Sequence, residues 1–115
     1  MVVSGGEESQ GQGADSAYFE YQVEQPVTAV PGSPAPRYPD SLRTAGVEGE
    51  VLVQFVVDAE GRPDVSTFKV LKANREEFVV AVRSALPEMR FQTARKSGRA
   101  VKQVVQQPFM FQVSR

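Results

Sequence analysis

The sequence predicts an α+β fold, a two-layer arrangement in which one main helix packs on one face of a three-stranded antiparallel sheet. Apolar side chains alternate with other residues over 50–58, which is the period of a strand, and recur at helical spacing over 78–89. A further stretch, residues 101–113, follows the helical segment and is long enough for a third strand. With a short helix before the first strand, the predicted order is short helix, strand, strand, helix, strand.

The first predicted elements are the short helix and the strand that follows it. Pro39 suits the first turn of a helix over residues 40–44, because its missing N–H is tolerated there, and Gly46 can end that helix. In the strand over residues 50–58, one face is entirely apolar and the other is partly apolar. The apolar face, which we expect to contribute to the core, comprises Val51, Val53, Phe55 and Val57.

Residues 58–62, Asp-Ala-Glu-Gly-Arg, predict a hairpin turn in which Gly61 takes the left-handed conformation. The return strand is expected over residues 64–71, with Phe68 and Val70 directed inward. Acidic residues around Gly61 have some of the character of a calcium loop, but their spacing and the missing Glu at the twelfth position argue against one. We therefore interpret them as turn residues.

The main helix is expected to start at Asn74, which together with Glu77 forms a variant of the capping box. Pro87 cannot continue a regular helix, so we expect the helix to end near Leu86. One apolar stripe lies between these signals, formed by Phe78, Val79, Val82, Ala85, Leu86 and Met89. A loop rich in Arg, Lys, Ser and Gly is expected to follow over residues 92–99.

Pro108 is the informative residue of the last predicted strand. A proline cannot donate to a ladder on its own N–H side, so within a sheet it is tolerated at an edge. We therefore predict that residues 101–113 form an edge strand, with a row of unpaired N–H and C=O groups.

Charge is unevenly distributed along the 115 residues. Residues 1–35 contain five acids and no Lys or Arg, whereas residues 36–115 hold all thirteen bases against nine acids. This surplus of four positive charges lacks the concentrated basic stripe expected of a nucleic-acid-binding protein. Residues 1–17 have little to bury and residues 18–36 are rich in Pro, so we predict a disordered, acidic and then Pro-rich linker over 1–35 and one folded domain over 36–115.

The sequence contains no Cys and no His. It therefore lacks disulfides, thiol chemistry, the usual ligands of structural zinc and the commonest general base near neutral pH. The acids fall in turns and at the helix start, without a pair arranged for catalysis, so we predict a non-enzymatic domain with no metal and no cofactor. No apolar run approaches the ~20 residues that span a bilayer, and residues 1–6 are not typical of a signal peptide.

Several motifs, in order and at matching spacing over residues 36–113, resemble the C-terminal domain of TonB proteins. They are Pro36-Arg37-Tyr38-Pro39, Ala45-Gly46-Val47-Glu48-Gly49, the alternating residues 51–58, the turn ending in Gly61-Arg62, and Pro108-Phe109-Met110-Phe111. The chain departs from the family pattern in having Met89-Arg90-Phe91 for Trp-x-Phe, Thr93-Ala94 for Pro-Ala, Ala100 for a Pro, and Gln103 and Gln107 at usually apolar positions. Met is an adaptable core residue, so we expect the fold to be retained.

The resemblance implies a periplasmic module of an energy transducer. In that family, the proton-motive force acts on an inner-membrane proton-channel complex, and TonB carries the energy across the periplasm to outer-membrane receptors, whose TonB box the C-terminal domain binds. The chain would then be the periplasmic domain of an inner-membrane-anchored protein whose anchor is missing from this sequence. A TolA-like or other TonB-like periplasmic adaptor, which does not energise transport, is the alternative interpretation, because it shares the fold.

An exposed edge strand can accept a partner peptide as an additional strand, with main-chain hydrogen bonds for affinity and side-chain pockets for selectivity. We place the docking row on the last strand, and the resemblance implies a second contact region before the first strand, where Arg43 is a candidate partner for the acid that commonly begins a TonB box. The candidate partner-binding residues are Lys102, Gln103, Val104, Val105 and Gln106, together with Arg43, Thr44, Ala45, Gly46 and Val47. A second copy of the domain could use the same edge and form a homodimer.

Basic residues gather in and around the predicted loop: Arg90, Arg95, Lys96, Arg99 and Lys102. The simpler interpretation of these residues, and of Arg43, is a solvated charged surface, since exposed ion pairs contribute little. The alternative for the loop is attraction of acidic peptide, peptidoglycan or lipid headgroups.

Overall fold

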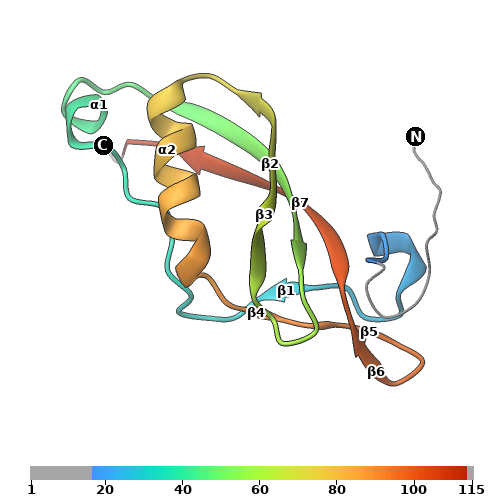
Figure 1. The fold of residues 1–115 in the computed structure, drawn as a ribbon. Coiled ribbons are helices and arrows are strands. Elements are labelled where there is room, and N and C mark those ends of the chain that lie inside the picture. The colour runs from blue at the N-terminus through green and yellow to red at the C-terminus, as the bar shows by residue number, and fades with distance from the viewer. Residues whose placement is uncertain (1–16, 114–115) are drawn as a thin grey trace.

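The structure, a computed structural model, describes residues 17–113. It is an α+β fold, as the sequence predicts: a three-stranded antiparallel sheet in the order β3-β2-β7, crossed on one face by helix α2 (Figure 1). The strands are β2 (Gly49–Val57), β3 (Pro63–Ala73) and β7 (Gln103–Phe111), and the helix is α2 (Glu76–Ala85). A short helix, α1 (Asp40–Thr44), precedes β2 at the predicted residues.

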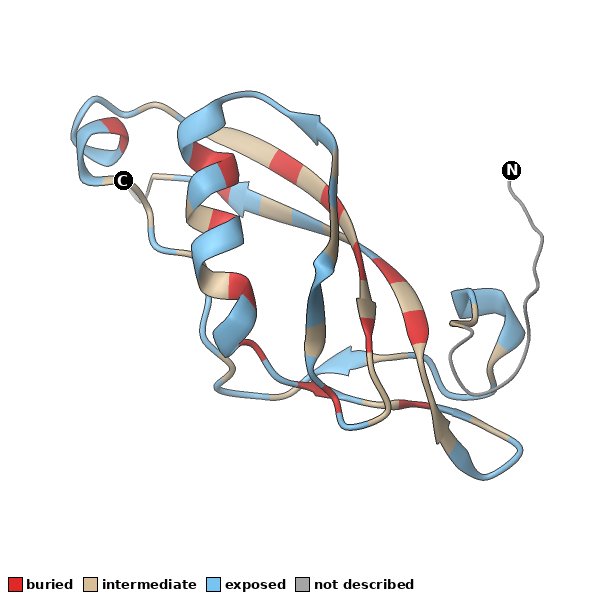
Figure 2. Cartoon of the chain, in the orientation of Figure 1, coloured by how far each residue is buried: buried red, intermediate tan, exposed pale blue. Residues whose placement is uncertain are grey.

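The hydrophobic core lies between the sheet and α2 (Figure 2). All four residues of the alternating apolar face of β2 are fully buried: Val51, Val53, Phe55 and Val57. Phe78 of α2 stacks on Phe111 of β7 with ring centroids 4.2 Å apart, and Tyr38 packs edge-on against both rings. The Tyr38 hydroxyl donates a hydrogen bond to the Val47 carbonyl, and burial of the phenol, followed by the charge of Glu48, raises the pKa of Tyr38. These contacts hold the end of β7 that lies nearest α1.

The hairpin between β2 and β3 requires glycine at Gly61. Its φ is +85°, in the left-handed region, and a Cβ at this position would lie 2.2 Å from the carbonyl oxygen of Phe91. This close approach lets the Phe91 N–H donate to the Gly61 carbonyl at 2.9 Å. Phe91 belongs to β4 (Phe91–Gln92), so the turn joins the sheet to the segment that follows α2. The predicted left-handed turn position is confirmed.

The start of α2 differs from the prediction. Asn74 does not cap the helix; the N-cap residue is Arg75, which makes no side-chain capping hydrogen bond. Instead, the Asn74 side chain accepts a hydrogen bond from the Glu50 N–H at 2.6 Å, and the Asn74 N–H donates to the Glu50 carbonyl at 3.2 Å. Asn74 therefore extends the ladder between β2 and β3, a use of its polar groups that competes with capping. The helix ends close to the prediction, at Ala85, before the 3-10 turn η2 (Leu86–Glu88).

A second hairpin lies in the region predicted to be a loop. Strands β5 (Ala94–Lys96) and β6 (Arg99–Val101) pair antiparallel. Ser97 and Gly98 at the turn both have positive φ, 53° and 78°, which is the arrangement of a type I′ turn. The Ser-Gly dipeptide is a signal for this turn, but the charged residues around it do not alternate with apolar ones, so the flanking strands have no sequence pattern.

Residues 17–35 precede the predicted domain boundary, yet part of this segment lies against the sheet and the β5–β6 hairpin (Figure 1). It contains the 3-10 helix η1 (Glu20–Gln22) and the short strand β1 (Thr28–Ala29), which pairs with β4. Proline content favours a linker here, but non-proline residues of the segment pair with the domain. Thr28 and Ala29, which lie between prolines, pair with β4, whereas Gln25 and Tyr18, which lie before Pro26, pair with β5 and β7. Residues 1–16, for which the composition also predicts disorder, lie outside the described residues.

Candidate functional site

Strand β7 forms one edge of the sheet, in agreement with the inference from Pro108. Its antiparallel register with β2 is uninterrupted over the whole strand. The Val104 N–H donates to a carbonyl outside the sheet, so the main-chain groups of the even-numbered residues of β7 point away from β2. The outward row on β7 consists of Val104, Gln106, Pro108 and Met110.

The downstream half of this row is open. Pro108 has no N–H, so the donors there are the N–H groups of Gln106 and Met110, and neither makes a backbone hydrogen bond within residues 17–113. The Gln107 side chain donates to the Pro108 carbonyl at 3.3 Å, and Gln106 Nε2 donates to Gln54 Oε1 at 3.0 Å. The Met110 side chain is 58% exposed. Free backbone groups of this kind are what an added strand needs.

The upstream end of the row is occupied by the chain itself. Tyr18 pairs in parallel with β7: its N–H donates to the Lys102 carbonyl at 2.9 Å, and its carbonyl accepts from the Val104 N–H at 2.8 Å. The Lys102 carbonyl and the Val104 N–H, which belong to residues that the sequence prediction assigns to a partner peptide, are therefore paired within the chain in this structure.

The other residues of the predicted docking row differ in orientation. Gln103 is 3% exposed and Val105 is 8% exposed, so both side chains lie on the core side of the sheet. Oε1 of Gln103 accepts a hydrogen bond from the Val27 N–H at 2.9 Å. Gln106 has an exposed side chain and outward main-chain groups. Successive residues of a strand alternate between its two faces, so strict alternation is the sequence signal that separates Gln103 and Val105 from Gln106. The same alternation extends the outward row to Met110, which the sequence prediction left out.

The second predicted contact region, residues 43–47, lies at the opposite end of β7. Gly49, just after this region, pairs with Phe111 at the end of the strand, whereas the predicted docking row lies at its start. The nine residues of β7 separate the two ends by roughly 26 Å at ~3.3 Å per residue. The structure thus places the two predicted regions at the two ends of one strand. Arg43 is exposed there and contacts Asp40 at 3.1 Å.

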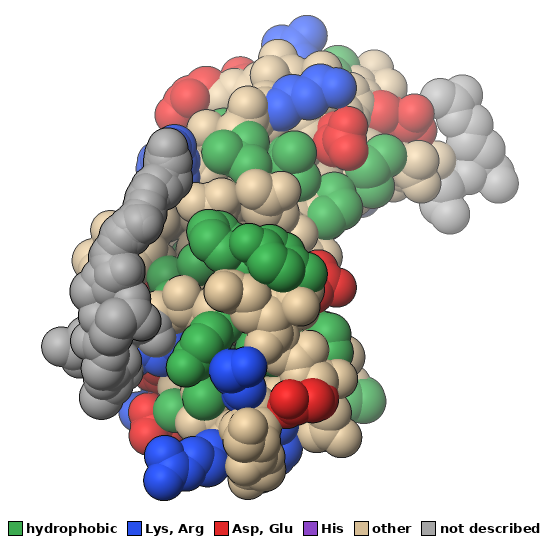
Figure 3. Space-filling model, turned by 90° about the vertical axis from the view of Figure 1, so that its right-hand side faces the viewer, with side chains coloured by type: hydrophobic (Ala, Val, Ile, Leu, Met, Phe, Trp, Pro, Cys, Tyr) green, Lys and Arg blue, Asp and Glu red, His purple; other side chains and the backbone are tan. Residues whose placement is uncertain are grey.

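The open face of the sheet beside this edge is partly apolar. Leu52 of β2 lies opposite Pro108, and Glu50 lies opposite Met110. Figure 3 shows the side of the molecule on which β7 and the N-terminal segment lie, with hydrophobic side chains across the middle and Lys and Arg at both the upper end and the lower end, the latter near the β5–β6 hairpin. A peptide strand added to β7 would direct alternate side chains toward this face.

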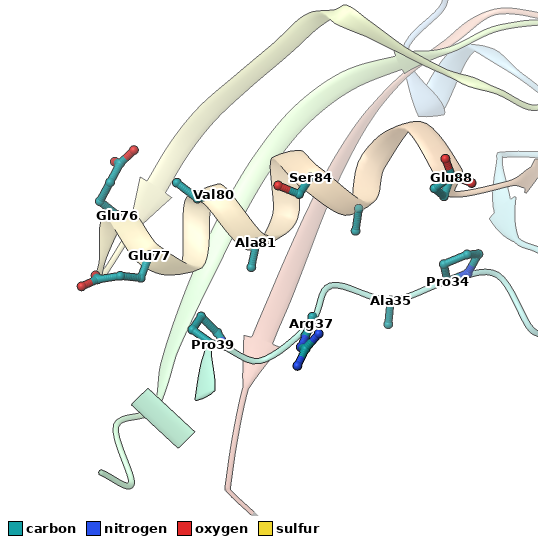
Figure 4. A pocket seen from close by; sticks show the side chains of 11 residues that line it. Pro34, Ala35, Arg37, Pro39, Glu76, Glu77, Val80, Ala81, Ser84 and Glu88 are labelled. Atoms are coloured by element: carbon teal, nitrogen blue, oxygen red, sulfur yellow. The ribbon is translucent and has the colours of Figure 1, made fainter. Parts of the chain in front are cut away.

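A separate groove of about 830 Å³ lies between α2 and residues 34–39 (Figure 4). Its walls are mainly aliphatic, with Val80 and Ala81 on the helix side and Pro34 on the facing segment. Acidic side chains also line it: Glu76, Glu77 and Glu88. No residue of β7 contributes to its lining, so this groove is distinct from the β7 edge.

Neither a metal-binding cluster nor a membrane-spanning helix occurs in the described part of the chain. Within residues 17–113, no group of acidic side chains is placed to hold a metal ion. No helix in that range is long and apolar enough to cross a bilayer. The candidate partner site on β7 is the open half of its edge, with the N–H groups of Gln106 and Met110.

The family described as Gram-negative bacterial TonB protein C-terminal matches residues 34–113 of this sequence. The chain belongs to this TonB C-terminal family. The matched range includes α1, α2 and all three strands of the main sheet, so the family and the fold are assigned to the same residues. A search of curated proteins gave no match.

Two solved structures of TonB domains show the same fold. The solution NMR structure of the Pseudomonas aeruginosa TonB C-terminal domain matches with a TM-score of 0.63 at 27% sequence identity, covering 77% of this chain and 88% of that chain. The TonB2 protein of Vibrio anguillarum matches with a TM-score of 0.57 at 22% identity, covering 100% of this chain and 98% of that chain, and supports the fold alone. The predicted TonB resemblance and the α+β fold are both confirmed.

Proposed function

We propose that this TonB C-terminal domain is the periplasmic peptide-binding module of a TonB-type energy transducer. It engages the TonB box of an outer-membrane transporter by β-strand addition, and it passes on force derived from the proton-motive force so that the transporter imports its substrate. The force originates at an inner-membrane proton-channel complex and reaches the domain through an N-terminal membrane anchor.

The observation that supports this proposal is the open half of the β7 edge. The free N–H groups of Gln106 and Met110, with the Pro108 carbonyl between them, offer a short ladder to a peptide strand. Each hydrogen bond contributes about 0.5–1.5 kcal/mol net, and ordering a flexible peptide offsets part of that gain. We therefore expect weak binding, about micromolar at best. Weak binding suits a partner that must be released in every cycle of force transmission.

The region around Arg43 is the second part of the proposed site. It lies beyond the Phe111 end of β7, so it would contact a portion of the partner that extends past the ladder. The ion pair between Arg43 and Asp40 is exposed on both sides, so it contributes little stability and can exchange for an acid of the partner.

The proposal is tested by titrating the isotope-labelled chain with a TonB-box peptide that begins with an acid. The backbone amide signals of Gln106 and Met110 should shift, because their N–H groups gain acceptors. Met110→Pro removes one donor and should weaken binding about two- to tenfold, whereas Met110→Ala keeps the N–H and serves as the control. Amides that stay unchanged along β7 at about 1 mM peptide would contradict strand addition and leave the TolA-like adaptor as the better interpretation.

A further inference from the structure

The N-terminal segment that lies on β7 is held to the domain at several points. We call residues 17–27 the strap. Gln25 and Arg95 form an antiparallel bridge: the Gln25 N–H donates to the Arg95 carbonyl at 3.2 Å, and the Arg95 N–H donates to the Gln25 carbonyl at 2.9 Å. Two residues further, the Val27 N–H donates to Oε1 of the buried Gln103 at 2.9 Å. The C-terminal part of the strap is therefore bound both to the β5–β6 hairpin and to the base of β7.

Side chains of the hairpin also contact the strap. The Ser97 N–H at the turn donates to the Glu24 carboxylate at 2.7 Å. Lys96 donates to the Gln22 carbonyl at 3.2 Å, and its ammonium lies 5.5 Å from the centre of the Tyr18 ring. The basic hairpin, whose charges the sequence interpretation left without a partner, thus holds an acidic and aromatic part of the same chain.

The N-terminal end of the strap is more loosely held than its C-terminal end. Tyr18 is attached by its two backbone hydrogen bonds, with Lys102 and Val104, and by the contact of its ring with the Lys96 ammonium. The C-terminal part of the strap combines the Gln25 bridge with bonds to Ser97 and the buried Gln103. Between Tyr18 and the Gln25 bridge, Phe19 and Tyr21 are 46% and 84% exposed and stack on each other rather than in the core. Tyr18 can therefore leave the edge while the bridge at Gln25 stays formed.

We propose that the strap is a built-in competitor for the partner peptide, an inference that rests on the proposed function. With Tyr18 in place, the ladder open to a peptide has its donors at Gln106 and Met110. When Tyr18 leaves, the Val104 N–H and the Lys102 carbonyl become available and the ladder lengthens at its upstream end. Because the strap belongs to the same chain, its effective concentration at the edge is high, and a peptide that uses the whole edge must displace it.

The position of Tyr18 also links this competition to tension. Among the described contacts, those of Tyr18 are the first that a pull on the chain from its N-terminal side would load. Such a pull would remove the competitor and lengthen the accessible edge. The domain would then bind its partner most tightly when the strap is under tension, which is when force must be transmitted to the partner.

The test compares Tyr18→Pro with Tyr18→Phe in the full chain. Proline at residue 18 has no N–H for the Lys102 carbonyl and disfavours the pairing, whereas phenylalanine keeps the backbone groups and the ring. With the same TonB-box peptide, Tyr18→Pro should bind roughly tenfold more tightly than the unchanged chain, the factor expected for about one to two net hydrogen bonds. Tyr18→Phe should bind as the unchanged chain does. Amide signals of β2 confirm that both variants are folded.

A second measurement uses the unchanged chain alone. As the peptide saturates the edge, the Tyr18 amide signal should move to the position of a free chain, because its acceptor on Lys102 is taken. If the peptide binds and the Tyr18 signal stays in place, or if Tyr18→Pro leaves the affinity unchanged, the strap is not a competitor, although strand addition stands. If neither the unchanged chain nor Tyr18→Pro binds the peptide, the proposed function itself fails.

Discussion

The two edges of the sheet are protected in different ways. The β3 edge is irregular: the pairing of β2 with β3 shifts register at two points, between Leu52 and Val53 and between Gln54 and Val56. At the second shift the Val56 N–H donates to the Thr67 hydroxyl at 2.8 Å. The β7 edge pairs with β2 without interruption along its full length. Bulges and irregular pairing discourage strand addition, whereas a regular edge invites it.

This difference shows which edge can be opened. The register shifts that protect the β3 edge are part of the pairing between β2 and β3. They therefore cannot be removed without disrupting the sheet. On β7 the protection comes from Pro108, which removes one donor, and from the strap, which covers the upstream end through Tyr18. The strap is a removable cover, since its Tyr18 end carries little of the core. A cover of this kind limits edge-to-edge association of the domain and still allows a peptide to bind the edge.

The largest expected effect comes from weakening β2, the central strand that pairs with both edge strands. Phe55 is fully buried on β2, and its ring lies 5.8 Å from that of Phe91. Phe55→Ala should lower the free energy of unfolding by about 3–5 kcal/mol through the cavity it creates, and binding of the TonB-box peptide should be lost in parallel. Urea denaturation measures this change. Val65→Ala on β3, at a side chain that is 50% exposed, is the control and should change stability by less than about 0.5 kcal/mol.

An intermediate effect is expected from separating the strap from β7. Gln103→Leu removes the acceptor for the Val27 N–H and should lower the free energy of unfolding by about 1–3 kcal/mol. Gln107→Leu is the matched control on the same strand, because the Gln107 side chain contacts its neighbouring Pro108 carbonyl and not the strap. It should change stability by less than about 0.5 kcal/mol. Equal effects of the two substitutions in thermal unfolding would mean that the buried hydrogen bond does not hold the strap.

Much of the fold could be predicted because its signals are local. The period of β2, the turn at Gly61 and the edge position of Pro108 each depend on a few consecutive residues, and the structure confirms them. Asn74 was harder to assign, because its capping pattern competes with a pairing to Glu50 across the hairpin. Pairings between segments distant in sequence leave no local pattern at all, so the Tyr18 contact with β7 could not be predicted.

The candidate site was predictable in part for the same reason. Pro108 identified the correct edge, because the loss of a donor is a property of one residue. The orientation of Gln103 and Val105 follows from strand alternation, but only once the strand boundaries and the buried face are known. Which part of the edge is open depends on the strap, a non-local contact. The docking row over residues 102–106 and the region over residues 43–47 therefore stay predictions, and binding measurements must decide them.

The smallest expected effect concerns Pro108, whose missing N–H interrupts the row of donors in the open half of β7. Pro108→Ala restores an N–H between the donors of Gln106 and Met110, so an added strand gains one hydrogen bond. Peptide affinity should rise about two- to tenfold, corresponding to about 0.5–1.5 kcal/mol. The more continuous edge should also promote self-association, which sedimentation velocity measures, because a second copy can use the same row. Lys69→Ala on β3 is the counterpart on the other edge and should change neither quantity. If Lys69→Ala altered peptide affinity as much as Pro108→Ala, the distinction between a closed β3 edge and an accessible β7 edge would be wrong.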